Sequence, residues 1–299
     1  MKNWQEFTYS ASDGLRLAGR RYGWENRGSV PVVCLSGLSR NSRDFHELAM
    51  HLSTEAGTRR RVLTLDYRGR GRSQYDPNWQ NYNLVVEADD VIQGLVAAGL
   101  QHAHFIGTSR GGLICMLLAG MRPGIMHSVI LNDVGPEIAG AGLVRIKKSL
   151  EAEHTARDWA DAAEQLKRAG ERDFPNRSQS GWERHARMIY RENGNARAGG
   201  KPGLVRDFDP KLGKTLAEID LDSPLPTMWA QFAGLAKHPL MLIRGKNTDL
   251  LDETAVQKMA GMHPAMERME IPDAGHVPDL GERPLAERIA AFLEANDTP

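Results

Sequence analysis

The stretch Gly107-Thr108-Ser109-Arg110-Gly111-Gly112 decides the fold of this chain of 299 residues. It follows His104-Phe105-Ile106, which reads as the end of a buried strand, and it leads into the segment 113–121, which is apolar nearly all round. A serine with glycine two places before it and two places after it, set between a strand and a helix, is typical of a nucleophile elbow. The strained backbone of such a turn leaves no room for side chains at the two glycine positions. We therefore expect Ser109 to be a nucleophile, in preference to an incidental serine in a glycine-rich turn.

Short apolar runs on both sides of this turn alternate with helix-length segments. Six runs predict strands: Val30–Leu35, Val62–Leu65, His104–Ile106, Ser128–Leu131, Pro239–Ile243 and Met266–Ile271. Three segments with a helical period predict helices, over 83–100, 113–121 and about 285–295. Apolar strands separated by helices indicate a parallel sheet with right-handed crossovers. A hairpin over 6–17 that turns at Ser12-Asp13-Gly14 should add an antiparallel edge.

The strand pattern stops between Asp133 and His238, a gap of roughly 100 residues that is too long for a loop without structure of its own. Helical periods over 156–169, 181–192 and 226–235 indicate a helical insertion above the carboxyl ends of the strands. We therefore expect a core made of residues 1–138 and 239–299, with a cap at 139–238. The glycine-rich segment 193–203 is expected to be flexible.

Charge and composition exclude several classes of function. The 38 Lys and Arg residues balance the 38 Asp and Glu residues, which argues against nucleic acid or an anionic membrane as the main partner. The run Arg68-Gly69-Arg70-Gly71-Arg72 is expected to be a tight, solvated turn in preference to an RNA contact. The first residues lead into no apolar segment of the kind that a secretory signal needs, and no stretch approaches the roughly 18 apolar residues of a membrane span. Cys34 and Cys115 lie in apolar runs and are expected to be core residues of a cytoplasmic protein.

A serine hydroxyl needs a base and an orienting acid before it acts as a nucleophile. His276 is the candidate base, because it lies in a loop between the last predicted strand and the last helix. For the acid we favour Asp249, which follows the strand 239–243, over Asp133, which follows the strand 128–131. Asp252 is expected to cap the helix that begins near Glu253. The order Ser, Asp, His along the chain is the one found in α/β-hydrolases.

An oxyanion in the transition state needs two donors that are already aimed at it. One should be the backbone N–H of Arg110, at the positive end of the helix that follows Ser109. The second should come from the loop 35–41, where the N–H of Leu38 is the candidate.

On these residues the chain resembles the α/β-hydrolase fold superfamily, in the subgroup with a helical cap between the sixth and seventh strands. The resemblance covers nearly the whole chain. Besides the elbow it includes Asp66-Tyr67-Arg68-Gly69-Arg70-Gly71-Arg72-Ser73, which is similar to the family's Asp-x-Arg-Gly-x-Gly-x-Ser turn, and Gly275-His276-Val277-Pro278. It implies a mostly parallel eight-stranded sheet with helices on both faces, and the roles of nucleophile, base and acid for Ser109, His276 and Asp249. The oxyanion loop departs from many members, which have His-Gly where this chain has Ser36-Gly37.

A serine at the elbow disfavours the dehalogenases and epoxide hydrolases of this superfamily, whose nucleophile is an aspartate. Hydrolysis of an ester, thioester, lactone or amide remains, together with C–C cleavage. Thr108 and Val277 stand where the related C–C hydrolases have Asn and often Trp, so we expect a carboxylic ester, with C–C hydrolysis or lactone hydrolysis as alternatives. A binding module without turnover is disfavoured, because a receptor has no need of His276 beside Ser109. The expected partner is a small ester-like molecule, with no cofactor and no metal.

Substrate specificity should lie in the cap. The candidates to line an apolar acyl pocket are Trp182, Met188, Tyr190, Met228, Trp229 and Phe232. Each could instead only pack the cap helices onto the sheet. Arg110 is a hypothetical selector of substrates that carry a carboxylate.

Overall fold

The computed structural model describes residues 3–152, 155–193, 203–217 and 225–297. Most of the segment that we expect to be flexible, 194–202, lies outside the described residues.

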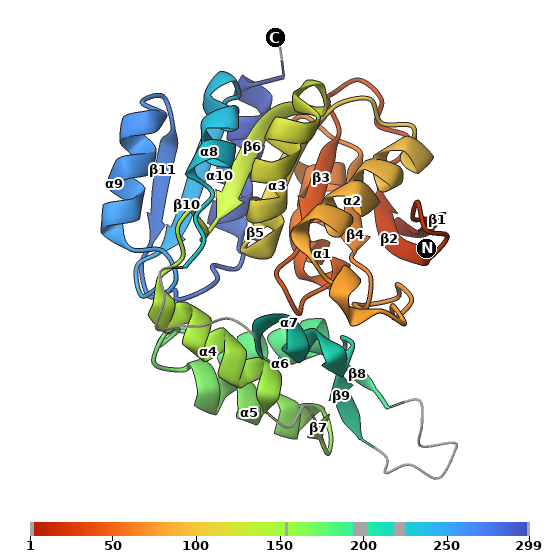
Figure 1. Cartoon of the computed structure of the whole chain (residues 1–299), viewed down its shortest axis with the longest axis vertical. Coiled ribbons are helices and arrows are strands. Elements are labelled where there is room, and N and C mark those ends of the chain that lie inside the picture. Colours follow the sequence, from red (N-terminus) through yellow and green to blue (C-terminus); the bar gives the residue numbers. More distant parts are fainter. Residues whose placement is uncertain (1–2, 153–154, 194–202, 218–224, 298–299) are drawn as a thin grey trace.

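A sheet of eight strands forms the centre of the molecule (Figure 1). In spatial order the strands are β1 (Trp4–Ser10), β2 (Arg16–Tyr22), β4 (Val62–Asp66), β3 (Val32–Leu35), β5 (Ala103–Thr108), β6 (Met126–Asn132), β10 (Leu240–Gly245) and β11 (Glu267–Ile271). β2 runs antiparallel to both β1 and β4, and every other neighbouring pair is parallel. The predicted fold class and the predicted opening hairpin are therefore confirmed.

Helices cover both faces of the sheet (Figure 1). One face packs against α2 (Leu84–Ala98), α3 (Arg110–Met121), α8 (Trp229–Ala233) and α9 (Glu253–Met262), and the other packs against α1 (His46–Met50) and α10 (Arg283–Ala295). Along β3, Val33 and Leu35 belong to the first core and Val32 and Cys34 to the second, as the alternation of side chains along a strand requires. Cys34 and Cys115 are free and buried, which confirms their reading as core residues.

The insertion forms a cap across the end of the sheet where β5 leads into Ser109 (Figure 1). It contains α4 (Gly140–Glu151), α5 (Trp159–Gly170), α6 (Gln179–Ile189) and α7 (Lys214–Ala217). It also contains an antiparallel sheet in the order β7 (Thr155–Ala156), β9 (Leu204–Arg206), β8 (Tyr190–Glu192). The prediction of a purely helical insertion was wrong on this point, because strands of two or three residues are too short to show alternation.

The last part of the predicted insertion packs with the core. Phe232 of α8 and Leu235 of the following 3₁₀ turn (Gly234–Lys237) belong to the core cluster that also contains residues of α3. The packing therefore places the return to the core before Trp229, and not at residue 238 as the sequence pattern indicated.

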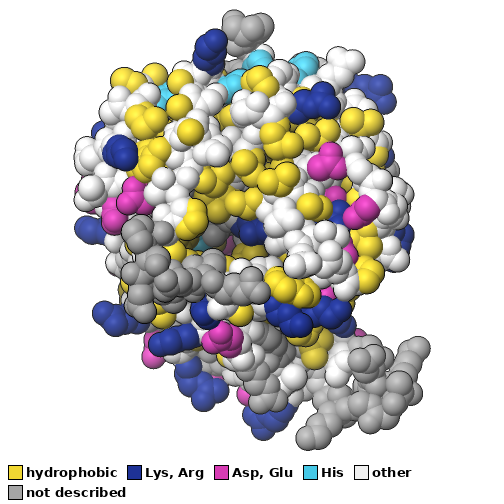
Figure 2. Space-filling view, in the orientation of Figure 1, with side chains coloured by type: hydrophobic (Ala, Val, Ile, Leu, Met, Phe, Trp, Pro, Cys, Tyr) yellow, Lys and Arg dark blue, Asp and Glu magenta, His cyan; other side chains and the backbone are white. Residues whose placement is uncertain are grey.

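The surfaces of the two parts differ in character. Figure 2 shows hydrophobic side chains gathered over the core half of this face and Lys and Arg side chains over the cap half. No helix in the described ranges combines the length and the hydropathy needed to cross a bilayer.

Candidate active site

Ser109 occupies the turn between β5 and α3 with φ 51° and ψ −117°, in a region that non-glycine residues rarely adopt. A Cβ at Gly107 would lie 2.6 Å from the backbone of Gly111, and a Cβ at Gly111 would lie 2.0 Å from the carbonyl oxygen of Leu35. Both distances are far below van der Waals contact, so both positions require glycine. The turn therefore has the geometry of a nucleophile elbow.

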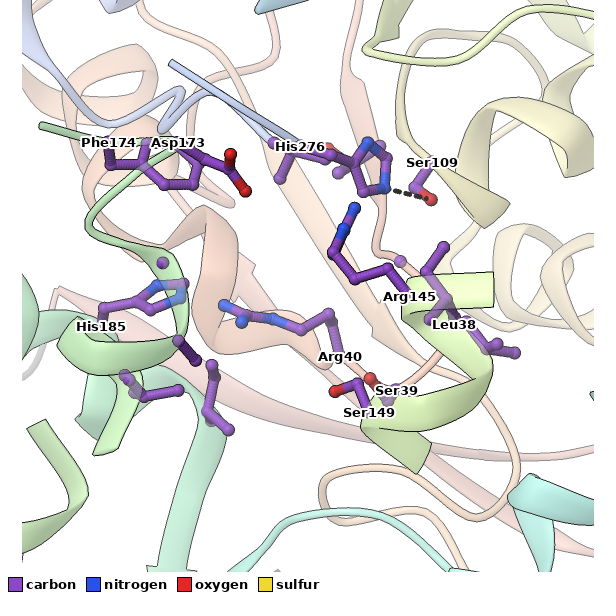
Figure 3. A pocket seen from close by; sticks show the side chains of 18 of the residues that line it. Leu38, Ser39, Arg40, Ser109, Arg145, Ser149, Asp173, Phe174, His185 and His276 are labelled. Atoms are coloured by element: carbon purple, nitrogen blue, oxygen red, sulfur yellow. Dashed lines mark hydrogen bonds between the residues drawn. The ribbon is translucent and has the colours of Figure 1, made fainter. Parts of the chain in front are cut away.

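His276 faces this serine from the loop between β11 and α10. Its Nε2 lies 2.9 Å from Ser109 Oγ, as the dashed line in Figure 3 shows. The side chain of His276 is only 9% exposed, so water has little access to the ring. The contact that we predicted between these two residues is therefore present in the structure.

Asp133 is the carboxylate that contacts the histidine. Its Oδ2 lies 2.7 Å from His276 Nδ1, and its side chain is fully buried. Two further donors fix its orientation: the backbone N–H of Gly245 donates to Oδ1 at 2.9 Å, and the hydroxyl of Thr248 donates to Oδ2 at 2.6 Å. A carboxylate in this position holds the imidazole with Nε2 turned toward the serine.

Asp249 does not occupy the position that we predicted for it. Its two oxygens accept hydrogen bonds at 2.6 and 2.7 Å from Arg145 of α4, and its side chain is 34% exposed. The hydrogen bonds from Arg145 lower the pKa of Asp249. Our choice of Asp249 over Asp133 is therefore wrong in its geometry, and Asp249 instead joins the cap to the loop after β10.

The reason lies in strand order. β6 and β10 are neighbours, so the loops that follow them end at the same edge of the sheet. The N–H of Asp133 donates to the carbonyl of Ile243 at 2.7 Å, which places Asp133 directly beside the end of β10. Sequence reasoning missed Thr248 and Arg145, and neither residue lies in a recognisable motif.

Leu38 and Arg110, whose amides we predicted as oxyanion donors, line the same cavity as Ser109. In the described part of the chain, neither the N–H of Arg110 nor the N–H of Leu38 donates to another protein group. The loop that carries Leu38 is held by Arg70, whose Nε donates to the carbonyl of Leu38 at 2.8 Å. Arg70 is fully buried and pairs with Glu87 at 2.7 Å. Arg70 therefore supports the loop that carries Leu38. The prediction of a solvated turn over 68–72 was wrong for Arg68 and Arg70, because both side chains are buried.

The side chain of Arg110 does not reach toward the cap to select a carboxylate, as we had hypothesised. Its Nε donates to Glu87 at 2.5 Å, and its Nη2 donates to the carbonyl of Tyr82 at 3.2 Å. Glu87 is buried between Arg70 and Arg110, so the guanidinium of Arg110 is already paired with a carboxylate of the core.

Two cavities meet at Ser109. One, of about 220 Å³, lies under the cap and is lined by Ser109, His276 and several polar residues, some of which Figure 3 shows (Ser39, Arg40, Arg145, Ser149, Asp173, Arg177, His185, Arg206). The other, of about 260 Å³, is almost entirely apolar and is lined by Ser109 and by residues such as Leu84, Leu113, Val134, Ile138, Leu143 and Leu216. We call them the arginine cavity and the apolar cavity.

The residues that we predicted to line the acyl pocket lie in different parts of the structure. Trp182 lines the arginine cavity, and Met228 lines the apolar cavity. Met188 lines a smaller cavity of about 40 Å³, and Tyr190 is buried in the core of the cap. For Trp229 and Phe232 the prediction was wrong. Phe232 is buried against α3, and the indole N–H of Trp229 donates to Glu137 at 3.0 Å outside both cavities.

Among the described residues, no group of three or more His, Cys, Asp and Glu side chains is arranged to hold a metal ion.

Comparison with known proteins agrees with the fold. Residues 32–291 match the model of the alpha/beta hydrolase family. The chain is 28% identical over 252 residues to a 3-hydroxybutyrate-oligomer hydrolase from Cupriavidus necator, a match that covers 83% of this chain and 82% of that protein. It is 24% identical over 271 residues to a 2-(acetamidomethylene)succinate hydrolase from Mesorhizobium japonicum, with 90% of each chain covered. A crystal structure of an alpha/beta hydrolase from Novosphingobium aromaticivorans superposes with a TM-score of 0.86 at 33% identity, covering 98% of this chain and 99% of that one.

Proposed function

The chain belongs to the alpha/beta hydrolase family, and from this premise we propose that it is a serine hydrolase that cleaves a carboxylic ester through an acyl-enzyme intermediate. The observation that carries the proposal is the unbroken series of contacts from Asp133 Oδ2 to His276 Nδ1 and from His276 Nε2 to Ser109 Oγ. This series has the order and the distances of a nucleophile, a general base and an orienting acid.

In the first step Ser109 Oγ attacks the carbonyl carbon, and its proton passes to Nε2 of His276. The carbonyl oxygen becomes an oxyanion that accepts hydrogen bonds from the N–H groups of Arg110 and Leu38. When the tetrahedral intermediate collapses, the C–O bond to the alcohol breaks and His276 gives its proton to the leaving oxygen. The acyl group is then esterified to Ser109.

In the second step a water molecule gives a proton to His276 and attacks the acyl carbon. The second tetrahedral intermediate collapses to the free acid, and Ser109 recovers its proton from His276. Asp133 stays hydrogen-bonded to Nδ1 throughout and stabilises the imidazolium that forms in each step. No step needs an oxidant or a reductant.

An ester is favoured over a C–C bond on two grounds. Thr108 and Val277 stand beside Ser109 and His276 where the related C–C hydrolases have Asn and often Trp. The relative from Cupriavidus necator is named for oligomers of 3-hydroxybutyrate, whose units are joined by ester bonds. Lactones and thioesters share the same acyl chemistry and belong in the same test.

The test is a panel of esters, thioesters, lactones and C–C ring-fission products offered to the purified protein and to Ser109→Ala. We expect hydrolysis of esters by the wild type, with kcat lowered on the order of a thousand-fold or more in the variant. Ser180→Ala, which removes an exposed hydroxyl on the cap, is the matched control and should keep wild-type activity. Equal ester hydrolysis by the wild type and Ser109→Ala would refute the proposal.

A further inference from the structure

The arginine cavity is lined by four arginines and, among the described residues, by one carboxylate. Of the four arginines that line it, Arg40 is paired with Asp44 at 2.7 Å and Arg145 is paired with Asp249 at 2.6 Å. Among the described residues, Arg177 and Arg206 have no carboxylate within ion-pair distance. The nearest polar contact of Arg206 is a hydrogen bond of 3.0 Å from its Nη1 to the hydroxyl of Ser149.

Both of these guanidinium groups have buried nitrogens without an acceptor. They are Nη1 of Arg177 and Nε of Arg206. Buried donors in proteins are nearly always satisfied, and an ionised donor without a partner is costly. Asp173 is the one carboxylate among the described residues that line the cavity. It lies at the end near His276 in Figure 3, where its charge acts on Arg145.

The pKa of His185 also reflects the positive charge in this cavity. It lies across the lower part of the cavity from Arg40 in Figure 3. Burial, and then the positive charges of Arg40, Arg177 and Arg206, hold the pKa of His185 well below its ordinary value. Burial, and to a lesser extent the charges of Arg40 and Arg184, lower the pKa of Arg177 to about 10, although the carboxylates of Asp279 and Glu282 oppose this shift. An anion in this cavity would relieve the repulsion.

The transfer of a proton from His276 to the leaving oxygen determines which part of an ester would lie in which cavity. The leaving oxygen must take its proton from Nε2 of His276, so the alcohol part lies on the side of the serine that His276 occupies. Of the two cavities, only the arginine cavity is lined by His276. The acyl part then extends to the other side, into the apolar cavity lined by Leu113, Val134 and Leu143.

We propose that the arginine cavity binds a carboxylate on the alcohol part of the substrate through Arg177 and Arg206, so that the preferred substrates are esters between a short apolar acyl group and a hydroxy acid. This inference rests on the proposed function, because it assumes the ester and the role of His276. Arginine suits the site because its planar fork binds both oxygens of a carboxylate.

Two matched pairs of substrates test the proposal. In the first pair, the butyryl esters of 3-hydroxybutyrate and of 3-hydroxybutyramide, the carboxylate on the alcohol part is replaced by a neutral amide. In the second pair, monoethyl succinate and ethyl succinamate, the same replacement is made on the acyl part. We expect kcat/KM of the wild type to favour the carboxylate in the first pair by about ten-fold or more, and not in the second pair.

Variants then assign the preference to residues. Arg177→Gln and Arg206→Gln should each bring the ratio of the first pair toward one, because each lowers kcat/KM for the carboxylate member more than for the amide member. Arg168→Gln is the control, since Arg168 lies on the same cap with its side chain 65% exposed and outside the cavity. If a variant fails to fold, inhibition of the wild type decides. 3-hydroxybutyrate should then inhibit more strongly than 3-hydroxybutyramide.

The outcomes distinguish a failure of the carboxylate site from a failure of the proposed function. Hydrolysis of both members of the first pair that depends on Ser109, with a ratio near one, would overturn the carboxylate site and leave the proposed function standing. A carboxylate preference confined to the second pair would overturn the assignment of the two cavities. Absence of any hydrolysis that depends on Ser109 would instead overturn the proposed function.

Discussion

Asp133 and His276 are joined by a contact of 2.7 Å although 143 residues separate them in the sequence. The contact exists because β6, β10 and β11 are consecutive in the sheet, so that the loops after them end at the same edge. Gly245 at the end of β10 and Thr248 in the loop after it both donate to Asp133. The carboxylate that contacts His276 thus comes from the loop after β6, while the end of β10 and the loop after it supply the groups that orient this carboxylate.

Substitutions of the two candidate acids, Asp133 and Asp249, should have very different effects on kcat. Asp133→Asn should lower kcat on the order of ten-thousand-fold, because the amide no longer holds the imidazole in the required tautomer. Asp249→Asn should keep kcat within about three-fold of the wild type, because that carboxylate contacts Arg145 and not the imidazole. Steady-state kinetics on one ester compares them, and a larger loss in Asp249→Asn would reverse the assignment.

The elbow predicts that alanine substitutions at two glycines of α3 have opposite effects on the stability of the protein. Gly111→Ala should destabilise the protein by about 3 kcal/mol, because its Cβ would lie 2.0 Å from the carbonyl oxygen of Leu35. Gly120 lies on the exposed side of α3, and no atom lies within 4 Å of a Cβ placed there. Gly120→Ala should therefore stabilise the protein by about 0.5 kcal/mol. Urea denaturation measures both, and similar effects at the two positions would contradict the described turn.

The ion pair between Asp249 and Arg145 predicts a dependence of stability on pH. The pKa of Asp249 is lower in the folded protein than in the unfolded chain, so the pair stabilises the fold above the unfolded pKa of about 4. This contribution is lost as the pH falls through the lower folded pKa. The difference in Tm between wild type and Asp249→Asn should therefore be present at neutral pH and shrink below about pH 4. A difference that grows in acid would contradict the pair.

The surroundings of His185 predict a low pKa for its imidazole, which NMR can measure. Burial and the surrounding arginines disfavour its charged form, so its imidazole should stay neutral through the range in which an ordinary histidine titrates. Arg206→Gln removes one of these charges and should raise the pKa of His185. His185→Asn identifies the resonance. An unchanged pKa in Arg206→Gln would show that the charge of Arg206 does not act on this cavity.

The sequence was sufficient for the elbow and the sheet because both depend on local patterns. Gly107 and Gly111 mark a turn that only glycine can make. The strands β3, β4, β5, β6 and β10 each show as a short, mostly apolar run. His276 was identifiable because it follows the last strand, in a loop that must end near Ser109.

The choice between Asp133 and Asp249 could not be made from the sequence. Both follow strands that end at the same edge of the sheet, and the orientation of each side chain depends on residues far along the chain. The contact of Asp249 with Arg145 requires knowledge of where α4 lies, and the pairing of Arg110 with Glu87 requires knowledge of where α2 lies. Tertiary packing, which no local pattern encodes, decides all of these contacts.

Labelling with a fluorophosphonate, followed by peptide mass spectrometry, tests the central claim most directly. We predict a single adduct on Ser109, formed at the wild-type rate in Asp249→Asn and far more slowly in Asp133→Asn and His276→Gln. An adduct on another residue, or labelling of Ser109 at an unchanged rate in Asp133→Asn, would contradict the account.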